Sequence, residues 1–189
     1  MIKELIARNR SYRRFNESKL IPRAMLYELL ELARLAASGG NRQPLKYMLS
    51  ADSETNAKAF PPLGWAGHLK DWPGPAEGER PTAYIIILGD TEVSKGFGCD
   101  HGIAAQNILL GAAERGLGGC MIAGIQRDAL RAALQIPERY EILLVVALGE
   151  PAEKVVIDDV GPDGDTKYWR DADDVHHVPK RTLEQLIVG

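Results

Sequence analysis

The stretch Thr82-Ala83-Tyr84-Ile85-Ile86-Ile87-Leu88-Gly89 is a continuous β-rich run, and Ile142-Leu143-Leu144-Val145-Val146-Ala147-Leu148-Gly149 is a second one. Strands that are apolar on both faces lie in the middle of a sheet that helices cover on each side. Between the two runs, residues 100–115 and 127–134 are expected to be helices. The alternation of strands and helices therefore predicts a three-layer α/β arrangement.

The composition is that of an ordinary globular chain, and its 189 residues suit a single domain with a full hydrophobic core. A net charge of −3 argues against nucleic-acid binding, which needs a basic surface. No apolar run is long enough to cross a bilayer, and the first residues lack the apolar core of a signal peptide. We therefore expect no membrane association and a cytoplasmic location. Cys99 and Cys120 have no metal-ligand spacing, so we expect structural thiols and no metal site.

A basic cluster follows a short amphipathic helix that is expected over residues 2–8. It places four arginines and a serine within seven residues: Arg8, Arg10, Ser11, Arg13 and Arg14. Guanidinium groups bind phosphate oxygens in pairs and stay charged at any working pH, so the cluster is suited to holding a phosphate. The alternative is a basic turn that only faces water.

A polar loop, Ser38-Gly39-Gly40-Asn41-Arg42-Gln43-Pro44, follows residues 22–37, whose apolar spacing predicts a helix. The two glycines are expected to cap that helix, and Pro44 is expected to make Gln43 extended ahead of a strand near residues 46–51. The amides of Asn41 and Gln43 can donate and accept hydrogen bonds, so this is a candidate recognition loop. The alternative is an ordinary polar connection.

Residues 60–81 are rich in Pro, Gly and Trp and show no periodicity. Long irregular loops in compact domains are often lids or binding loops, so this segment is a candidate lid. Trp65 and Trp72 would either cover an apolar ligand or anchor the loop to the core. His68 is expected at the surface or in a hydrogen bond.

A glycine-rich stretch, Gly116-Leu117-Gly118-Gly119-Cys120-Met121-Ile122-Ala123-Gly124, lies between the two expected helices. It follows a helix and leads into a strand, which is the reverse of the dinucleotide-binding order. It therefore predicts a helix C-cap at Gly116 and a short buried strand at residues 120–123. Gly124, at the strand end, could let a flat ligand approach the main chain.

Residues 150–189 are charged and rich in turns, so they are expected to form an extended tail that wraps a partner subunit. A second basic group, Lys180 with Arg181, lies near the end of this tail. The adjacent His176 and His177 would face opposite ways on a strand, which makes them a poor pair of metal ligands.

Three features together resemble the nitroreductase family of FMN-dependent oxidoreductases. They are Arg10-Ser11-Tyr12-Arg13-Arg14-Phe15, the loop at residues 37–44, and the expected helix from Asp100 that continues into residues 116–124. The resemblance spans nearly the whole chain and ends at Pro179-Lys180-Arg181. It implies one α+β domain over residues 1–189, with a mixed central sheet flanked by helices. It also implies a homodimer with FMN in a groove at the dimer interface.

The resemblance implies FMN contacts at four places. The N-terminal motif and the last basic pair would bind the phosphate and the polar flavin edge, the polar loop would reach the flavin from the neighbouring subunit, and residues 123–124 would offer main-chain amides. The residues are Arg10, Ser11, Arg13, Ser38, Asn41, Gln43, Ala123, Gly124, Lys180 and Arg181. Ala37 and Leu45 stand where the family often has Pro and Trp, and residues 60–81 replace a longer helical excursion.

The implied function is that of an oxidoreductase in which FMN takes hydride from NADH or NADPH and a small organic acceptor, such as a nitroaromatic or a quinone, takes the electrons. No side chain is expected to be a catalytic acid, base or nucleophile, because the cofactor carries the chemistry. Arg13 is expected to stabilise the reduced cofactor electrostatically. The alternatives are a flavin enzyme for dehalogenation, dehydrogenation or flavin cleavage, a non-catalytic flavin-binding module, and a protein whose basic turn docks a partner.

Overall fold

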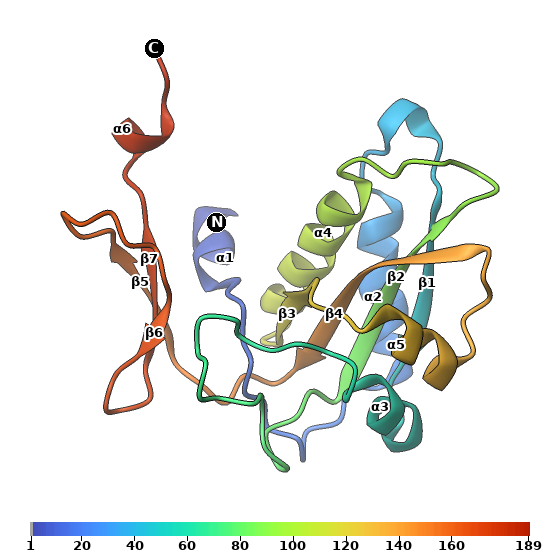
Figure 1. The fold of residues 1–189 in the computed structure, drawn as a ribbon, viewed down its shortest axis with the longest axis horizontal. Helices are drawn as coiled ribbons and strands as arrows, with labels where there is room; N and C mark the ends of the chain where they lie inside the picture. The colour runs from blue at the N-terminus through green and yellow to red at the C-terminus, as the bar shows by residue number, and fades with distance from the viewer. Residues whose placement is uncertain (1) are drawn as a thin grey trace.

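The computed structural model describes residues 2–189, and it contains a four-stranded sheet between two pairs of helices (Figure 1). The strands lie in the order β1 (Leu45–Ser50), β2 (Ala83–Asp90), β4 (Tyr140–Gly149) and β3 (Gly118–Ile122), and every neighbouring pair is antiparallel. The two β-rich runs are β2 and β4, and they pair with each other in the middle of the sheet as predicted.

Strands β2 and β4 are apolar on both faces because both faces are covered. All eight residues of β2 are buried. Ile85 lies opposite Val146 and Ile86 lies opposite Val145, so successive side chains point alternately into two separate cores.

Two helices cover each face of the sheet (Figure 1). Helices α2 (Arg23–Arg34) and α4 (Asp100–Glu114) pack on one face, and α3 (Ser53–Ala59) and α5 (Arg127–Leu134) pack on the other. Helix α5 has the predicted bounds, and α4 ends one residue before the predicted end. The α+β fold with a sheet between helices is confirmed.

Helix α3 was not expected from the sequence, because most of its residues are polar and its only buried residue is Ala59. A local signal for it is the carboxylate of Asp52, which accepts a hydrogen bond from the main-chain N–H of Thr55 at 2.8 Å and so caps the first turn.

The tail forms a small sheet of its own, which Figure 1 shows beside α1 (Ile2–Arg8) and away from the four-stranded sheet. Its strands β5 (Val155–Asp159), β7 (His176–Lys180) and β6 (Trp169–Arg170) lie in that order. The pair β5–β7 is parallel and the pair β7–β6 is antiparallel, so the mixed pairing lies here and in a parallel bridge between Ser11 and Gly119.

The tail ends in a single turn of helix, α6 (Leu183–Leu186), and its last apolar side chains are exposed. None of the helices described in residues 2–189 is both long enough and apolar enough to cross a membrane.

Candidate functional site

A cavity of about 360 Å³ lies between the N-terminal turn, α4, β3 and the tail sheet. This volume falls within the roughly 300–1,000 Å³ of small-molecule sites. Two of its walls, the N-terminal turn and the tail sheet, carry three cations between them, and the described residues that line it include no carboxylate. The cavity is therefore suited to an anionic ligand. Its lining consists of Asn9, Arg10, Ser11, Arg13, Gln106, Leu109, Met121, Tyr168, His176, Val178 and Lys180.

The N-terminal turn lies against β3 because β3 begins with two glycines. Ser11 bridges Gly119, whose carbonyl oxygen accepts a hydrogen bond from the N–H of Tyr12 at 3.0 Å. A Cβ on Gly118 would lie 2.5 Å from the Tyr12 ring, and one on Gly119 would lie 2.5 Å from the main-chain oxygen of Ala147. No other residue type fits at these positions, so the glycine pair is what allows the arginines to reach the cavity.

A buried carboxylate attaches the same turn to the tail. Glu153 accepts hydrogen bonds from the main-chain N–H groups of Arg13 and Arg14, and its other oxygen lies 2.8 Å from the Arg170 guanidinium. The side chains of Glu153 and Arg170 are 2% and 9% exposed, so this ion pair is largely shielded from water. It holds β6 and the N-terminal turn in one fixed arrangement.

The arginines of the turn are oriented differently. Arg10 donates from Nη2 to the main-chain oxygen of Ile6 at 2.9 Å, while its Nε is buried and has no hydrogen-bond partner in the described part of the chain. Arg13 donates to the main-chain oxygen of Ser11, contacts His176 and lies over the ring of Tyr168. Arg14 instead pairs with carboxylates away from the cavity.

The two neighbouring histidines of β7 face opposite ways, as expected. His176 is buried in the cavity wall, and burial together with the nearby Arg13 guanidinium lowers its pKa to about 4. His177 lies between Asp171 and Asp158, whose hydrogen bonds raise its pKa.

Residues 60–81 reach the cavity wall through Tyr168. The main-chain N–H of His68 donates to the Tyr168 hydroxyl at 3.2 Å, and the two rings meet edge to face. Trp72 stacks with the Arg170 guanidinium, 4.4 Å away, and Trp65 packs against Phe60. Both tryptophans therefore anchor the loop. Whether the loop acts as a lid stays a prediction.

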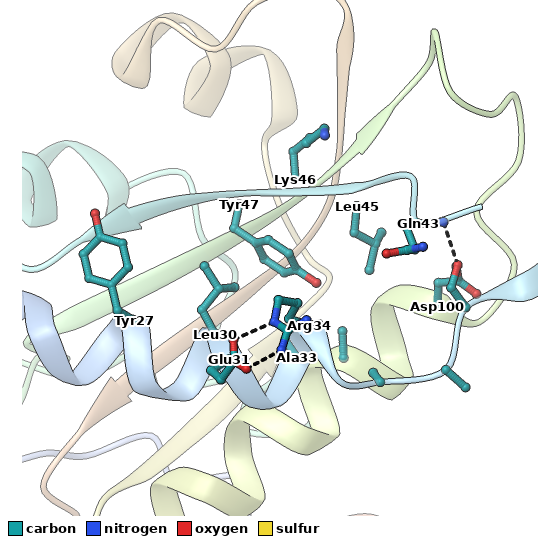
Figure 2. Close-up of a pocket in the computed structure, with 14 residues that line it drawn as sticks. Tyr27, Leu30, Glu31, Ala33, Arg34, Gln43, Leu45, Lys46, Tyr47 and Asp100 are labelled. Atoms are coloured by element: carbon teal, nitrogen blue, oxygen red, sulfur yellow. Dashed lines mark hydrogen bonds and ion pairs between the residues drawn. The ribbon is translucent and has the colours of Figure 1, made fainter. Parts of the chain in front are cut away.

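The polar loop lies in a second cavity, of about 420 Å³, between α2 and β1 (Figure 2). Asp100, the first residue of α4, accepts from the Ser38 hydroxyl at 2.6 Å and from the Gly39 N–H at 2.9 Å. These two bonds, the Ser38 bond first, lower the pKa of Asp100. The Ser38 hydroxyl also accepts from the N–H of Gln43 at 3.0 Å, so it is used within the loop.

Two expectations for this loop are wrong. Helix α2 ends at Arg34 and not at the glycines, which instead form a 3₁₀ turn at Gly39–Asn41. Gln43 has φ +51° and is left-handed instead of extended. The Ser38 hydroxyl holds the Gln43 N–H, and this local hydrogen bond overrides the preference of a residue before proline.

The remaining candidates lie outside both cavities. Ala123 and Gly124 follow β3, which covers Gly118–Ile122 and not residues 120–123. The oxygen of Gly124 accepts from the N–H of Gly64 at 2.7 Å, so this glycine contacts the 60–81 loop. Asn41 and Arg181 are exposed. In one chain, the cavity of the N-terminal turn thus unites Arg10, Ser11, Arg13 and Lys180 of the ten predicted residues.

The family model for nitroreductases matches residues 6–73 and 90–150. The chain belongs to the nitroreductase family. A protein of Archaeoglobus fulgidus, provisionally named an NADH dehydrogenase/NAD(P)H nitroreductase, is 30% identical over 135 residues, which are 67% of this chain and 72% of that protein. A protein of Methanothermobacter thermautotrophicus with the same name is 28% identical over 79% of this chain and 77% of its own length.

Solved structures of nitroreductases share the fold. A nitroreductase family protein of Streptococcus pneumoniae superposes with a TM-score of 0.69 at 18% identity and covers 86% of this chain and 96% of its own. The structure of an FMN-dependent nitroreductase from Clostridium difficile has a TM-score of 0.64 at 24% identity. The match covers 82% of this chain and 89% of that one.

In this member of the nitroreductase family, sequence reasoning assigned no site role to four residues that line the cavity or support it. Gln106 faces the cavity from α4, Tyr168 and His176 face it from the tail, and Glu153 holds the turn. The apolar residues of α4 recur at helical spacing, and Gln106 could have been noticed as a polar residue on this packed helix. The other three are brought in by pairings between the two ends of the chain, for which the sequence contains no local signal.

Proposed function

We propose that the protein is an FMN-dependent oxidoreductase that takes hydride from NADH or NADPH and reduces a small organic acceptor such as a nitroaromatic or a quinone. Membership of the nitroreductase family and the names of its relatives support this proposal. The observation that carries it is the cavity in which Arg10 and Arg13 of the N-terminal turn meet Lys180 of the tail, with no carboxylate among the described residues that line it.

The cavity residues fit FMN by their chemistry. FMN combines a dianionic phosphate with a flat ring, and the cavity offers three cations and a hydroxyl beside apolar walls from Leu109 and Met121. The buried Nε of Arg10 has no acceptor within residues 2–189, and a phosphate oxygen would satisfy it. When bound, FMN supplies the redox chemistry, accepting electrons from the nicotinamide and passing them to the acceptor.

In this mechanism the chain would bind the cofactor and orient it. Arg10, Ser11 and Lys180 would hold the phosphate, and Arg13, fixed by its contacts with Tyr168 and His176, would place a permanent positive charge beside the ring. Leu109 and Met121 would exclude water from that side. No protein side chain has to give or take a proton for electron transfer, and accordingly none is assigned a catalytic role.

We also propose that the working form is a cytoplasmic homodimer of single-domain chains. The loop between α2 and β1, which contains Ser38, Asn41 and Gln43, lies away from the tail sheet in Figure 1, so a second copy would have to bring its polar loop to the cavity. Exposed apolar side chains at the tail end support a tail that wraps the partner. They are Leu183, Leu186, Ile187 and Val188.

The test is to purify the protein, measure its FMN affinity and mix it anaerobically with NADH or NADPH. The proposal expects a yellow protein that the nicotinamide bleaches and that a panel of nitroaromatics and quinones reoxidises. A yellow protein that neither nicotinamide reduces would instead be a flavin-binding module, and a colourless one that FMN does not reconstitute would refute FMN binding.

Matched variants test the assignment of the phosphate contacts. Arg10→Ala and Lys180→Ala should each lower the affinity for FMN about tenfold, because charge-assisted hydrogen bonds to the phosphate contribute about 1.5–3 kcal/mol. The affinity for riboflavin, which lacks the phosphate, should fall much less. Arg115→Ala is the control, since Arg115 pairs with Glu28 and Glu114 and does not line the cavity. If FMN and riboflavin lost affinity equally, the phosphate would have to bind elsewhere.

A further inference from the structure

Arg13 is held from three directions in the cavity. Its Nη1 lies 3.2 Å from the main-chain oxygen of Ser11 and 3.2 Å from Nε2 of His176. The guanidinium carbon lies 4.7 Å from the centre of the Tyr168 ring, and that ring lies 5.2 Å from the ring of His176. Both hydrogen bonds use Nη1, so they leave Nη2 and Nε for another acceptor.

The contact with Arg13 fixes the state of the His176 ring. A guanidinium only donates hydrogen bonds and keeps its proton in proteins, so Nε2 of His176 has to accept. The imidazole is therefore neutral and carries its proton on Nδ1. This Nδ1 is buried and has no hydrogen-bond partner among residues 2–189. Since an unpaired buried N–H is unfavourable, the contact on the Nε2 side is what selects this tautomer.

We propose that His176 is a positioning residue whose neutral imidazole holds the Arg13 guanidinium against Tyr168, so that the free edge of Arg13 faces the ligand in the cavity. The inference rests on the proposed function, in which that ligand is FMN. His176 is suited to this task because it is 1% exposed and its main-chain N–H donates to the main-chain oxygen of Lys154 at 2.8 Å. A rigid acceptor on β7 thus reduces the freedom that Arg13 would lose when it binds an anion.

The surroundings of His176 favour the neutral ring. Burial is the largest cause, followed by the positive charge of Arg13 on the N-terminal turn. Arg170 on β6 and His177 on β7 act in the same direction, and Glu153, between β4 and β5, acts against them. The acceptor for Arg13 is therefore present at any pH at which the protein would work.

The test measures FMN binding to reconstituted protein by quenching of flavin fluorescence. His176→Leu, which removes the acceptor at similar size, should raise the FMN dissociation constant about tenfold, the effect of losing one well-placed charged contact. His176→Gln should restore binding to within about threefold, because an amide oxygen can accept from Arg13. His177→Gln is the control on the same strand, and it should bind FMN like the parent.

A double-mutant cycle with Arg13→Ala distinguishes an effect of His176 through Arg13 from a nonspecific structural effect of the substitution. If His176 acts through Arg13, His176→Leu should change FMN affinity less than about twofold in the Arg13→Ala background. A tenfold loss in both backgrounds, or no loss in the parent background, would overturn the inference. Failure of the parent protein to bind FMN would instead refute the proposed function.

The tautomer can be read without any variant, which covers the case that His176→Leu does not fold. Nitrogen NMR of the parent protein at neutral pH should show a proton on Nδ1 of His176 and a bare Nε2. A proton on Nε2 would mean that Nε2 cannot accept from Arg13, and it would overturn the inference.

Discussion

Burial of His176 predicts how the stability of the protein depends on pH. Its pKa is lowered from 6.5 to about 4, first by burial and then by Arg13. Between these values the unfolded chain binds a proton that the folded chain does not, so stability rises with pH in this window and is lost as pH falls from 6.5 toward 4. At pH 5.0 the loss relative to pH 7.5 is about 2 kcal/mol from this residue alone.

The assay is urea unfolding of the apoprotein at pH 7.5 and pH 5.0, at one protein concentration because subunit association would shift the midpoint. The variant His176→Gln lacks the titrating group, so its free energy of unfolding should fall about 2 kcal/mol less between the two pH values than that of the parent.

The neighbouring histidine supplies a control of opposite sign. The pKa of His177 is raised by its hydrogen bonds to Asp171 and Asp158, so its contribution is present at low pH and is lost as pH rises through its folded pKa. His177→Gln should therefore increase the acid sensitivity that His176→Gln reduces. Equal pH dependence in His176→Gln and the parent would show that His176 is not held neutral by burial.

Three further predictions concern packing, the cofactor and assembly. Gly119→Ala should lower the free energy of unfolding by about 1–3 kcal/mol, because the new methyl group would lie 2.5 Å from the main-chain oxygen of Ala147. Gly102→Ala, in helix α4 with nothing within 4 Å, should instead raise it by up to about 1 kcal/mol. Urea unfolding of both variants checks this pair, and a loss in both would contradict it. Arg13→Ala should lower the midpoint potential of bound FMN, by about 30 mV for each 1.4 kcal/mol of lost stabilisation, and spectroelectrochemistry would detect it. An unchanged potential would place Arg13 away from the ring. Sedimentation with FMN bound should give twice the chain mass of 20.7 kDa at micromolar concentration, and a single-chain mass would refute the shared site.

The layers of the fold could be predicted because their signal is local. β2, β4 and α5 are each encoded by an apolar run or stripe within one short segment, and the structure reproduces them. Helix α3 was missed since it buries almost nothing, and its cap at Asp52 is a weak signal on its own.

The site could be predicted only in part, for a different reason. The arginines of the N-terminal turn and Lys180 carry a charge pattern that the sequence displays directly. The conformation of Gln43 depends on the hydroxyl of Ser38, and the tail sheet depends on pairing between β5 and β7, segments separated by β6. Such pairings are set by contacts that form only in the folded chain, so the sequence pattern cannot show them.

The contact of Glu153 with the main chain of Arg13 makes the cavity depend on two segments that lie 140 positions apart in the sequence. The N-terminal turn supplies Arg10 and Arg13, and the tail sheet supplies His176 and Lys180, whereas the four-stranded sheet pairs without the tail. Proteolytic cleavage between β4 and β5 would therefore open the cavity without breaking a strand pair of the central sheet.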